Sequence, residues 1–342
     1  MEQITTVGID LAKSVVSVHG VDARGNTVLR RTLSAARLME FMARVPPCRV
    51  GMEACSGAHA VARGLQALGH DARIMAPKFV VPYRKNQKND GNDAEAICEA
   101  VGRPKMRFVP VKSAEQQAVL VVHRVRAELV SARAGLINQV RGLLAEFGLV
   151  MPKGRFTFRH QVAAVMEDAR VPTLARTMLQ EVVARIRTLD EDILAYDRRI
   201  DAQVRHSEPM QRIGKLCGVG PITASAIVAS VGDAKLFKNG RQFAAWLGLV
   251  PRQYSTGGRP ILGRITKRGD VYLRTLLVHG ARSALITLAH RNDRLARWAA
   301  ALIARRGFKR ACVALAAKNA RVIWALLAHG EPLRLEPMAA TA

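Results

Sequence analysis

The segment ITTVGIDLAKSVVSVHGVDARGNTVLRRTL, residues 4–33, restricts the fold more than any other stretch of the chain. It contains three runs rich in β-branched residues, separated by the short link "LAK" and by "DARGN", whose residue types favour turns. Connections this short join antiparallel neighbours, whereas parallel neighbours need a long crossover. The segment therefore predicts a three-stranded antiparallel meander at the start of a sheet.

The next residues alternate between helical and strand patterns. We expect a helix near 35–44, a strand at 48–54, a helix near 57–68 and a strand at 71–77. A meander followed by a β-α-β-α-β run indicates an α/β domain with a mixed sheet, in a ribonuclease H-like order.

Acidic residues fall at notable places in this order. Asp10 closes the first predicted strand and Glu53 closes the fourth, so the two carboxylates lie together if those strands are neighbours. In "KNDGNDAEAICEA", Asp90 and Asp93 stand three residues apart at the mouth of a helix, on one face. Four converging carboxylates require cations, and their hard oxygens suit Mg²⁺ or Mn²⁺.

Two such ions activate a nucleophile and stabilise the leaving oxygen of a phosphodiester. The alternative is structural: a strand-end Asp10 is then a turn residue and Asp93 is a helix N-cap.

The middle of the chain is helical. Apolar residues recur at spacings of three and four over 113–148, and again over 189–204 after the loop MPKGRFTFRH. We expect two long helices packed as an antiparallel hairpin, an arm of the kind that serves subunit association. An ordinary bundle packed on its own domain is the alternative.

Charge indicates the partner. The 342 residues include 53 Lys and Arg against 27 Asp and Glu, a net charge of +26, and residues 241–330 carry 17 basic side chains against only Asp270 and Asp293. Such a balance favours nucleic acid. The sequence has no uninterrupted apolar stretch of about 18 residues and no signal peptide. We therefore expect a soluble cytoplasmic protein with no membrane partner. The five scattered cysteines fit reduced core residues rather than a zinc site.

The segment IGKLCGVGPITASAIVASVGD resembles a helix-hairpin-helix module, with Gly218 and Gly220 before a helix that begins near Pro221. Glycines let backbone amides approach a phosphate, and a helix N-terminus favours the anion. A plain glycine turn between two core helices is the alternative.

The segment QYSTGGRP, residues 253–260, places two hydroxyls beside glycines and basic residues, in a loop before a helix that starts near Asp270. We expect this region to hold phosphate through Thr256, Gly257, Gly258, Arg259, Arg264, Lys267 and Arg268. No His or Lys stands at an obvious activating distance from Ser255. The residues alone thus leave open whether Ser255 binds a phosphate or attacks it.

Four segments resemble the insertion-sequence-110 family of transposases: VGIDLAKSVVSVHG, GMEACSGAHAVARGL, KNDGNDAEAICEAV and GLVPRQYSTGGRPILGRITKRGDVYLRTLLVHGAR. The resemblance covers nearly the whole chain. It implies a RuvC-like catalytic domain of DEDD type at 1–110, a helical arm at 111–208 and a C-terminal transposase domain at 209–335. The metal-binding acids then correspond to Asp10, Glu53, Asp90 and Asp93, and the family's essential serine corresponds to Ser255, with Thr256 as its neighbour.

The resemblance also implies a recombinase that cuts and rejoins DNA under the guidance of a structured noncoding RNA. It implies a homo-oligomer, a dimer or tetramer, with composite active sites, working in the bacterial cytoplasm at the nucleoid. Two other function classes stay open on the residues alone. One is a RuvC-like structure-specific endonuclease using metal-activated water, and the other is a noncatalytic nucleic-acid-binding protein.

Overall fold

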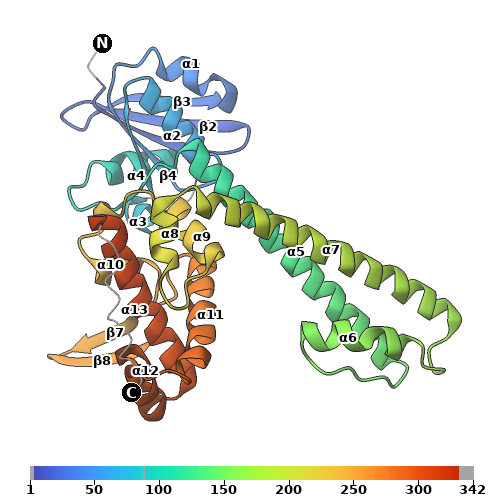
Figure 1. The fold of residues 1–342 in the computed structure, drawn as a ribbon. Coiled ribbons are helices and arrows are strands. Elements are labelled where there is room, and N and C mark those ends of the chain that lie inside the picture. Colours follow the sequence, from blue (N-terminus) through green and yellow to red (C-terminus); the bar gives the residue numbers. More distant parts are fainter. Residues whose placement is uncertain (1–3, 86, 88, 331–342) are drawn as a thin grey trace. The chain divides into compact units, whose positions relative to one another are not determined.

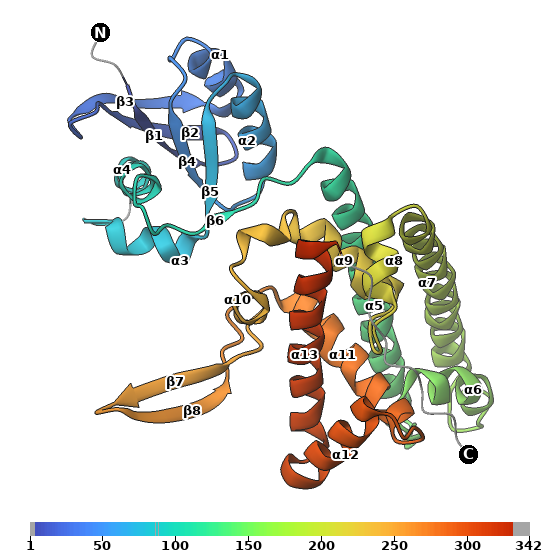
Figure 2. The ribbon, with the colours of Figure 1, turned by 60° about the vertical axis from the view of Figure 1, so that its left-hand side comes forward.

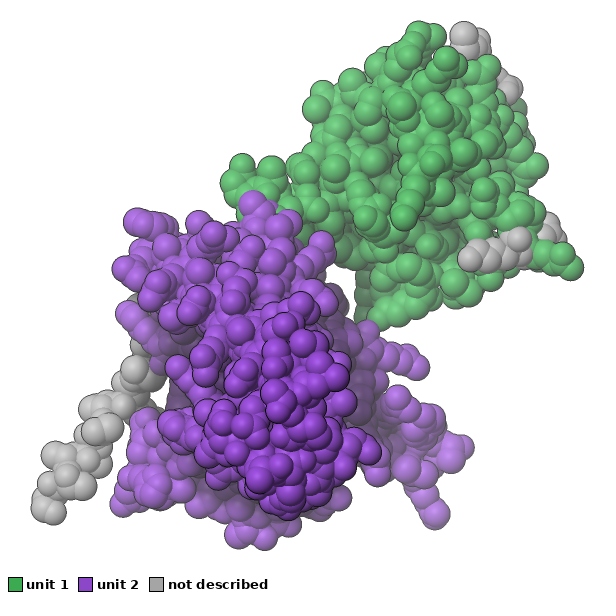
Figure 3. Space-filling view, turned by 90° about the vertical axis from the view of Figure 1, so that its right-hand side faces the viewer, with its two compact units in different colours: residues 1–117, 231–233 green, residues 118–230, 234–342 purple. Residues whose placement is uncertain are grey.

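The computed structural model describes residues 4–85, 87 and 89–330, and the chain divides into two compact units (Figure 3). One unit comprises the chain up to Gln117 together with Val231–Asp233, and the other comprises the remainder. The expected arm and C-terminal domain thus belong to a single unit. The link between them is short, since one helix ends at Arg205 and the next begins at Glu208.

The first unit is built on a six-stranded mixed sheet, as the sequence predicts (Figure 1). Its order is β3-β2-β1-β4-β5-β6. The strands are β1 (Thr6–Leu11), β2 (Val15–Val21), β3 (Thr27–Ser34), β4 (Arg49–Glu53), β5 (Asp71–Met75) and β6 (Phe108–Val109). The meander β1-β2-β3 is antiparallel, and β1, β4 and β5 run parallel. The short antiparallel edge strand β6 was not predicted, because two residues carry no period.

Helices cover both faces of this sheet (Figures 1 and 2). Val7, Ile9, Val50 and Met52 face α1 (Leu38–Met42) and α2 (Ala58–Ala67) in one core. The opposite face lies under α4 (Asp90–Val101), whose Ala96, Ile97, Ala100 and Val101 form a second core with Met75. Short turns of helix, η1 (Ala35–Arg37), α3 (Pro77–Val80) and η2 (Val81–Tyr83), connect these elements.

The second unit begins with the two long helices that the sequence predicts, α5 (Ala114–Ala145) and α7 (Thr173–Arg205). Arg126 pairs with Asp197, and Arg133 pairs with Asp190 at 2.6 Å. Seven residues forward along α5 correspond to seven backward along α7, so the helices are antiparallel and in register (Figure 1). The predicted loop MPKGRFTFRH is partly wrong. Its second half starts α6 (Arg155–Met166), because Phe158, Val162 and Met166 recur at helical spacing and are buried against α5 and α7.

The C-terminal part of this unit is helical except for one hairpin. It contains α8 (Glu208–Gly214), α9 (Pro221–Val231), η3 (Ala234–Leu236), α10 (Gly240–Trp246), β7 (Pro251–Thr256), β8 (Arg259–Ile265), α11 (Val271–Leu288), α12 (Arg294–Arg306) and α13 (Phe308–His329). Among the described residues, α13 alone has the length and composition to cross a membrane, but half of its apolar stretch is buried inside the unit. With Leu315, Ala320 and Ile323 fully buried, it is the central helix of this part of the core.

Candidate active-site residues

Asp10 and Glu53 stand side by side at the carboxyl ends of neighbouring strands. The parallel register of β1 and β4 pairs Gly8 with Gly51 and Ile9 with Met52, so Asp10 and Glu53 follow as the next pair. Gly8 and Gly51 both face α4, since a Cβ on Gly8 would lie 2.2 Å from the carbonyl oxygen of Ala94 and one on Gly51 would lie 2.7 Å from Val101 Cβ. Because side chains alternate along a strand, both carboxylates leave the sheet on the α4 side.

The direction of α4 brings Asp90 and Asp93 to the same end of the sheet. Cys98 Sγ donates to the carbonyl oxygen of Thr6 at 3.6 Å, and Ala94 lies over Gly8. Moving forward along β1 therefore means moving back along α4, so Asp10 lies toward the first turn of that helix. Both aspartates belong to this first turn.

The helix N-cap is Asn89, whose side-chain oxygen accepts from Asn92 N at 2.8 Å. Asp93 is therefore not the cap, so the alternative of a helix N-cap at this residue is wrong. Its Oδ1 instead accepts from Arg84 Nη1 at 3.2 Å. Asp90 is exposed, while Asp10, Glu53 and Asp93 are partly buried.

Cys55 lies near Asp10 and Glu53, and it is exposed, so the prediction of a core residue is wrong for this cysteine. Partial desolvation raises the pKa of its thiol, and the carboxylates of Asp10 and Glu53 raise it further, so both acids lie within electrostatic range of this sulfur atom. Hard carboxylate oxygens at one sheet edge fit the donor chemistry of a divalent metal. Within the residues that the structure describes, however, no three acidic, His or Cys side chains are drawn together as a metal cluster.

Ser255 and Thr256 lie in a β-hairpin rather than in the predicted loop. Strands β7 and β8 pair antiparallel, with Ser255 opposite Pro260 and Thr256 opposite Arg259. The turn between them is Gly257-Gly258, with φ of 53° and 75°. Two left-handed residues in a two-residue turn match the twist of a hairpin, which is why glycine fits both positions.

The hairpin separates the two hydroxyls. Consecutive residues of a strand point to opposite faces, so Ser255 shares a face with Gln253, Pro260 and Leu262, and Thr256 lies on the other face. Gln253 Nε2 donates to Ser255 Oγ at 2.7 Å, consistent with that division. An amide that donates cannot remove the hydroxyl proton, so this contact orients Ser255 without activating it.

The base of the hairpin is tightly packed. A Cβ on Gly269 would lie 2.0 Å from Trp246 O, so the chain entering α11 crosses the end of α10 at backbone contact. The buried Arg274 donates from Nη1 to the carbonyl oxygens of Leu247 and Gly269, both at 3.2 Å. Lys267, whose backbone amide donates to Gly248 O at 3.1 Å, has φ of 54°. It is the one non-glycine residue of the described chain in the left-handed region.

The basic residues predicted to bind phosphate lie on this hairpin or directly after it. Arg259 and Arg264 belong to β8, and Lys267 and Arg268 follow it; all four are exposed. Asp270 caps α11 through Leu273 N at 3.0 Å, where the sequence places the start of that helix.

The predicted glycine pair before α9 has two different surroundings. Gly218 packs against α11, where a Cβ on it would lie 2.7 Å from Gly280 O, so its first role is close packing. Gly220 is exposed, and a Cβ there would meet no atom within 4 Å. Of the two, only Gly220 leaves room beside its backbone for a phosphate.

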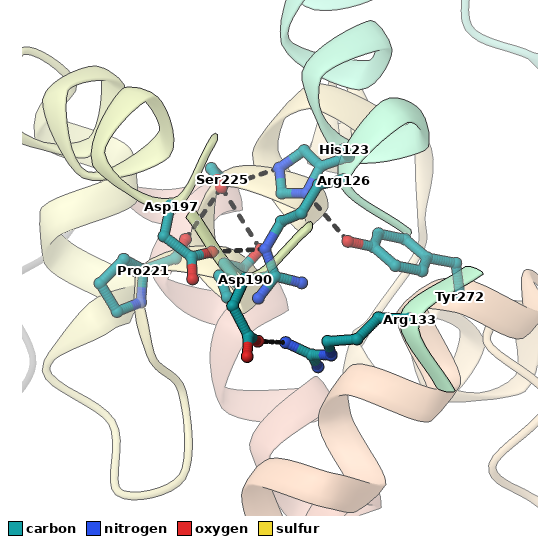
Figure 4. A network of polar contacts seen from close by, with 9 residues as sticks. His123, Arg126, Arg133, Asp190, Asp197, Pro221, Ser225 and Tyr272 are labelled. Atoms are coloured by element: carbon teal, nitrogen blue, oxygen red, sulfur yellow. Dashed lines mark hydrogen bonds and ion pairs between the residues drawn. The ribbon is translucent and has the colours of Figure 1, made fainter. Parts of the chain in front are cut away.

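A buried polar network in the second unit was missed by sequence reasoning (Figure 4). His123 of α5 contacts Ser225 Oγ of α9 through Nε2 at 2.9 Å and Tyr272 Oη of α11 through Nδ1 at 3.0 Å. Ser225 Oγ donates to Pro221 O at 2.9 Å, so it accepts from His123 Nε2, and His123 Nδ1 accepts from Tyr272. Burial, with help from Arg126, lowers the pKa of His123 to about 4. A neutral imidazole therefore ties the arm helix to the helix that follows the hairpin.

Comparison with known proteins gives a consistent result across the chain. The family model described as "Transposase IS116/IS110/IS902 family" matches residues 210–298, and the DEDD transposase model of IS110 type matches residues 7–148. A probable family 20 transposase of Pseudomonas aeruginosa is 52% identical over 329 residues, covering 95% of this chain and 97% of that protein. The transposase for insertion sequence element IS1111A of Coxiella burnetii is 41% identical over 98% of this chain and 92% of its own. That of IS1328 from Yersinia enterocolitica is 41% identical over 96% of this chain and 98% of its own.

Proposed function

Because this chain belongs to the IS110 family and is the transposase of an insertion sequence, we propose that it cuts and rejoins DNA with Ser255 as nucleophile and the four acids as metal ligands. The observation that supports this most is the register of β1 and β4, which brings Asp10 and Glu53 together on the sheet face covered by α4, whose first turn contains Asp90 and Asp93. A transposase acts on DNA, and a DEDD domain implies a divalent metal. We propose Mg²⁺, with Mn²⁺ as its substitute.

Asp10, Glu53, Asp90 and Asp93 would hold the metal. When bound, it supplies positive charge to the phosphodiester and to the leaving oxygen. Arg84 Nη1 donates to Asp93 Oδ1 at 3.2 Å and so orients this carboxylate; a metal held by Asp93 would compete with that contact.

Ser255 carries the proposed covalent step. Its Oγ forms a bond to the phosphorus of the DNA backbone as the bond from phosphorus to one deoxyribose oxygen breaks. The hydroxyl loses its proton, and the departing oxygen gains one. Gln253 directs Oγ on an exposed strand, and the exposed Arg259 and Arg264 of the same hairpin supply positive charge near the phosphate. A second transfer to a new deoxyribose hydroxyl releases the serine and joins the strands.

Activation of Ser255 requires a group beyond its own hairpin, since the side-chain contact described for Oγ is the amide of Gln253. We propose that the acids of one subunit and the serine of another form the working site in a dimer or tetramer. The long antiparallel pair α5 and α7 would serve as the arm that holds the subunits together. A structured noncoding RNA would supply sequence recognition, which the strongly basic C-terminal third accommodates. The protein would work in the bacterial cytoplasm at the nucleoid.

The test uses purified full-length protein, Mg²⁺, the transcript of the element's noncoding flank and labelled DNA carrying the joined element ends. We expect a denaturation-resistant protein–DNA adduct on Ser255, its loss in Ser255→Ala, and its retention in Thr256→Ala, because Thr256 lies on the other face. Trypsin does not cleave between Arg259 and Pro260, so residues 253–264 form one peptide on which the attached residue can be mapped.

DNA cleavage without an adduct would contradict the serine mechanism and support the endonuclease alternative, in which a metal-activated water attacks. Unchanged activity in both Asp10→Asn and Glu53→Gln would contradict the metal role of the acids.

A further inference from the structure

The β7–β8 hairpin exposes apolar side chains to an unusual degree. Every residue of β7 and every residue of β8 except Ile265 is exposed, and Tyr254 and Ile261 remain 64% and 57% exposed. The two strands project from the helices of the second unit (Figure 2). An isolated two-stranded hairpin is marginally stable in water, because neither face is buried. Its exposed apolar side chains are therefore placed to contact a partner.

The pairing register gives the two faces different chemistry. Tyr254 is directly opposite Ile261, and Thr256 is opposite Arg259, so these four side chains form one face. We call them the tyrosine face. The other face holds Ser255 with Gln253, Pro260 and Leu262. Tyr254 and Ser255 are consecutive on β7, so the ring and the hydroxyl lie on opposite faces at the same point along the strand. A nucleic-acid strand that passes around the exposed edge of β7 at this point can contact both.

Charge indicates what the tyrosine face binds. Residues 251–269 contain no acidic residue and five basic ones, Arg252, Arg259, Arg264, Lys267 and Arg268. Arg259 lies on the tyrosine face itself. An aromatic ring flanked by guanidinium groups matches a nucleic-acid strand, whose bases stack and whose phosphates carry the charge.

We propose that Tyr254 stacks on an unpaired nucleobase beside the phosphate that Ser255 attacks, with Ile261 supporting the ring. This rests on the proposed function and adds to it a base-binding residue that positions the substrate. The attack of Ser255 Oγ on phosphorus requires the phosphate to be held in one position. A stacked base restrains the phosphate of its own nucleotide through the sugar that joins them. Because stacking on one aromatic side chain is worth about 5- to 150-fold in binding, we expect adduct formation at low DNA concentration to slow by that factor when the ring is lost.

The experiment uses Ser255→Ala protein, which cannot form the adduct, so that the readout is independent of the chemistry. DNA carrying the joined element ends, with 5-iododeoxyuridine at one position at a time, is irradiated with the protein and the flanking transcript and digested with trypsin. We expect crosslinks in peptide 253–264, on Tyr254, from bases next to the cleavage position only. In protein that retains Ser255, Tyr254→Phe should form the adduct at nearly the normal rate.

Tyr254→Val removes the ring but keeps strong strand propensity, so the hairpin is retained. This variant should form the adduct about 5- to 150-fold more slowly. Its rate should also no longer depend on the base beside the cleavage position, so that DNA with an abasic site there reacts as fast as intact DNA. Ile286→Ala, at an exposed apolar position of α11 outside the hairpin, is the matched control and should have no effect.

Two outcomes overturn the inference. One is an adduct on Ser255 that forms equally fast in Tyr254→Val. The other is crosslinking of the bases next to the cleavage position to other tryptic peptides, with none to peptide 253–264. Either leaves the serine mechanism standing, whereas base crosslinks at Tyr254 without any adduct on Ser255 would refute the serine mechanism and support the stacking.

Discussion

Lys267 is held in a backbone conformation that costs energy, and replacing it with glycine should remove that cost. A left-handed φ costs an L-residue roughly 1–2 kcal/mol, and glycine is free of this cost. Glycine in turn adds about 0.5–1 kcal/mol of conformational entropy to the unfolded chain. Lys267→Gly should therefore leave the free energy of unfolding unchanged or raise it by up to about 1.5 kcal/mol.

Arg268→Gly is the matched control, because it removes one positive charge from the next residue, whose φ is not positive. Arg268→Gly adds conformational entropy to the unfolded chain but removes no left-handed strain from the folded chain. The two variants should differ by about 1–2 kcal/mol, with the Lys267 variant the more stable.

Urea unfolding followed by tryptophan fluorescence measures this difference in the right part of the molecule, since Trp246, Trp298 and Trp324 all belong to the second unit. With a urea slope of about 2–3 kcal/mol per molar, the midpoints should differ by roughly 0.3–1 M. Equal destabilisation in both variants would refute the reasoning, because it would mean that Lys267 is unstrained. Each variant should also lower the salt dependence of DNA binding by about one phosphate contact.

Two further predictions follow from buried or paired charges. Arg84→Gln removes the ion pair of the Asp93 carboxylate, so Mn²⁺ binding measured by calorimetry should tighten. For an ion pair worth about 1 kcal/mol, the Mn²⁺ affinity should rise roughly 5-fold. Arg103→Gln is the control: it releases Glu99 on the same helix and should leave the Mn²⁺ affinity unchanged. His123 is neutral when folded, with its pKa lowered from 6.5 to about 4, so the unfolded chain binds more protons between these values. The contribution of His123 to the free energy of unfolding should therefore fall by about 3 kcal/mol as the pH drops from 6.5 toward 4. His123→Gln should remove this pH dependence of the urea midpoint, and a pH profile that the substitution leaves unaltered would contradict the prediction.

The strand and helix order of the first unit was predictable because each element has a clear period and clear breaks. β-branched runs and tight links predicted the meander, and alternating patterns predicted the crossovers. The sequence placed Asp10 and Glu53 at strand ends but left open whether those strands are neighbours, which the parallel pairing of β1 and β4 shows. The contact between Arg84 and Asp93 could not be predicted. Arg84 lies in the linker between η2 and α4, and no local sequence pattern says which helix face a linker side chain contacts. Tertiary packing decides it.

The hydrogen-bond network around His123 was unpredictable for a related reason. Its members stand 102 and 149 residues from His123 along the chain, and each is unremarkable in its own segment. By contrast, the hairpin was within reach of the sequence. Gly257-Gly258 between two short runs is a hairpin signal, but the density of hydroxyls and arginines favoured a phosphate-binding loop.

That difference matters for the chemistry, because a loop leaves two adjacent hydroxyls equivalent while a strand does not. In β7, alternation sends Ser255 and Thr256 to opposite faces, and Gln253 contacts only the first. The serine then needs no better intrinsic reactivity than the threonine to be the nucleophile; it needs only to face the phosphate. The same alternation places Tyr254 on the threonine's face, so a substrate strand must pass around the edge of β7 to contact the serine hydroxyl on one face and the aromatic ring on the other. A double variant that exchanges the two hydroxyl residues should therefore keep adduct formation at position 255, now on threonine. An adduct on the new serine at position 256 would show that the face does not select the nucleophile.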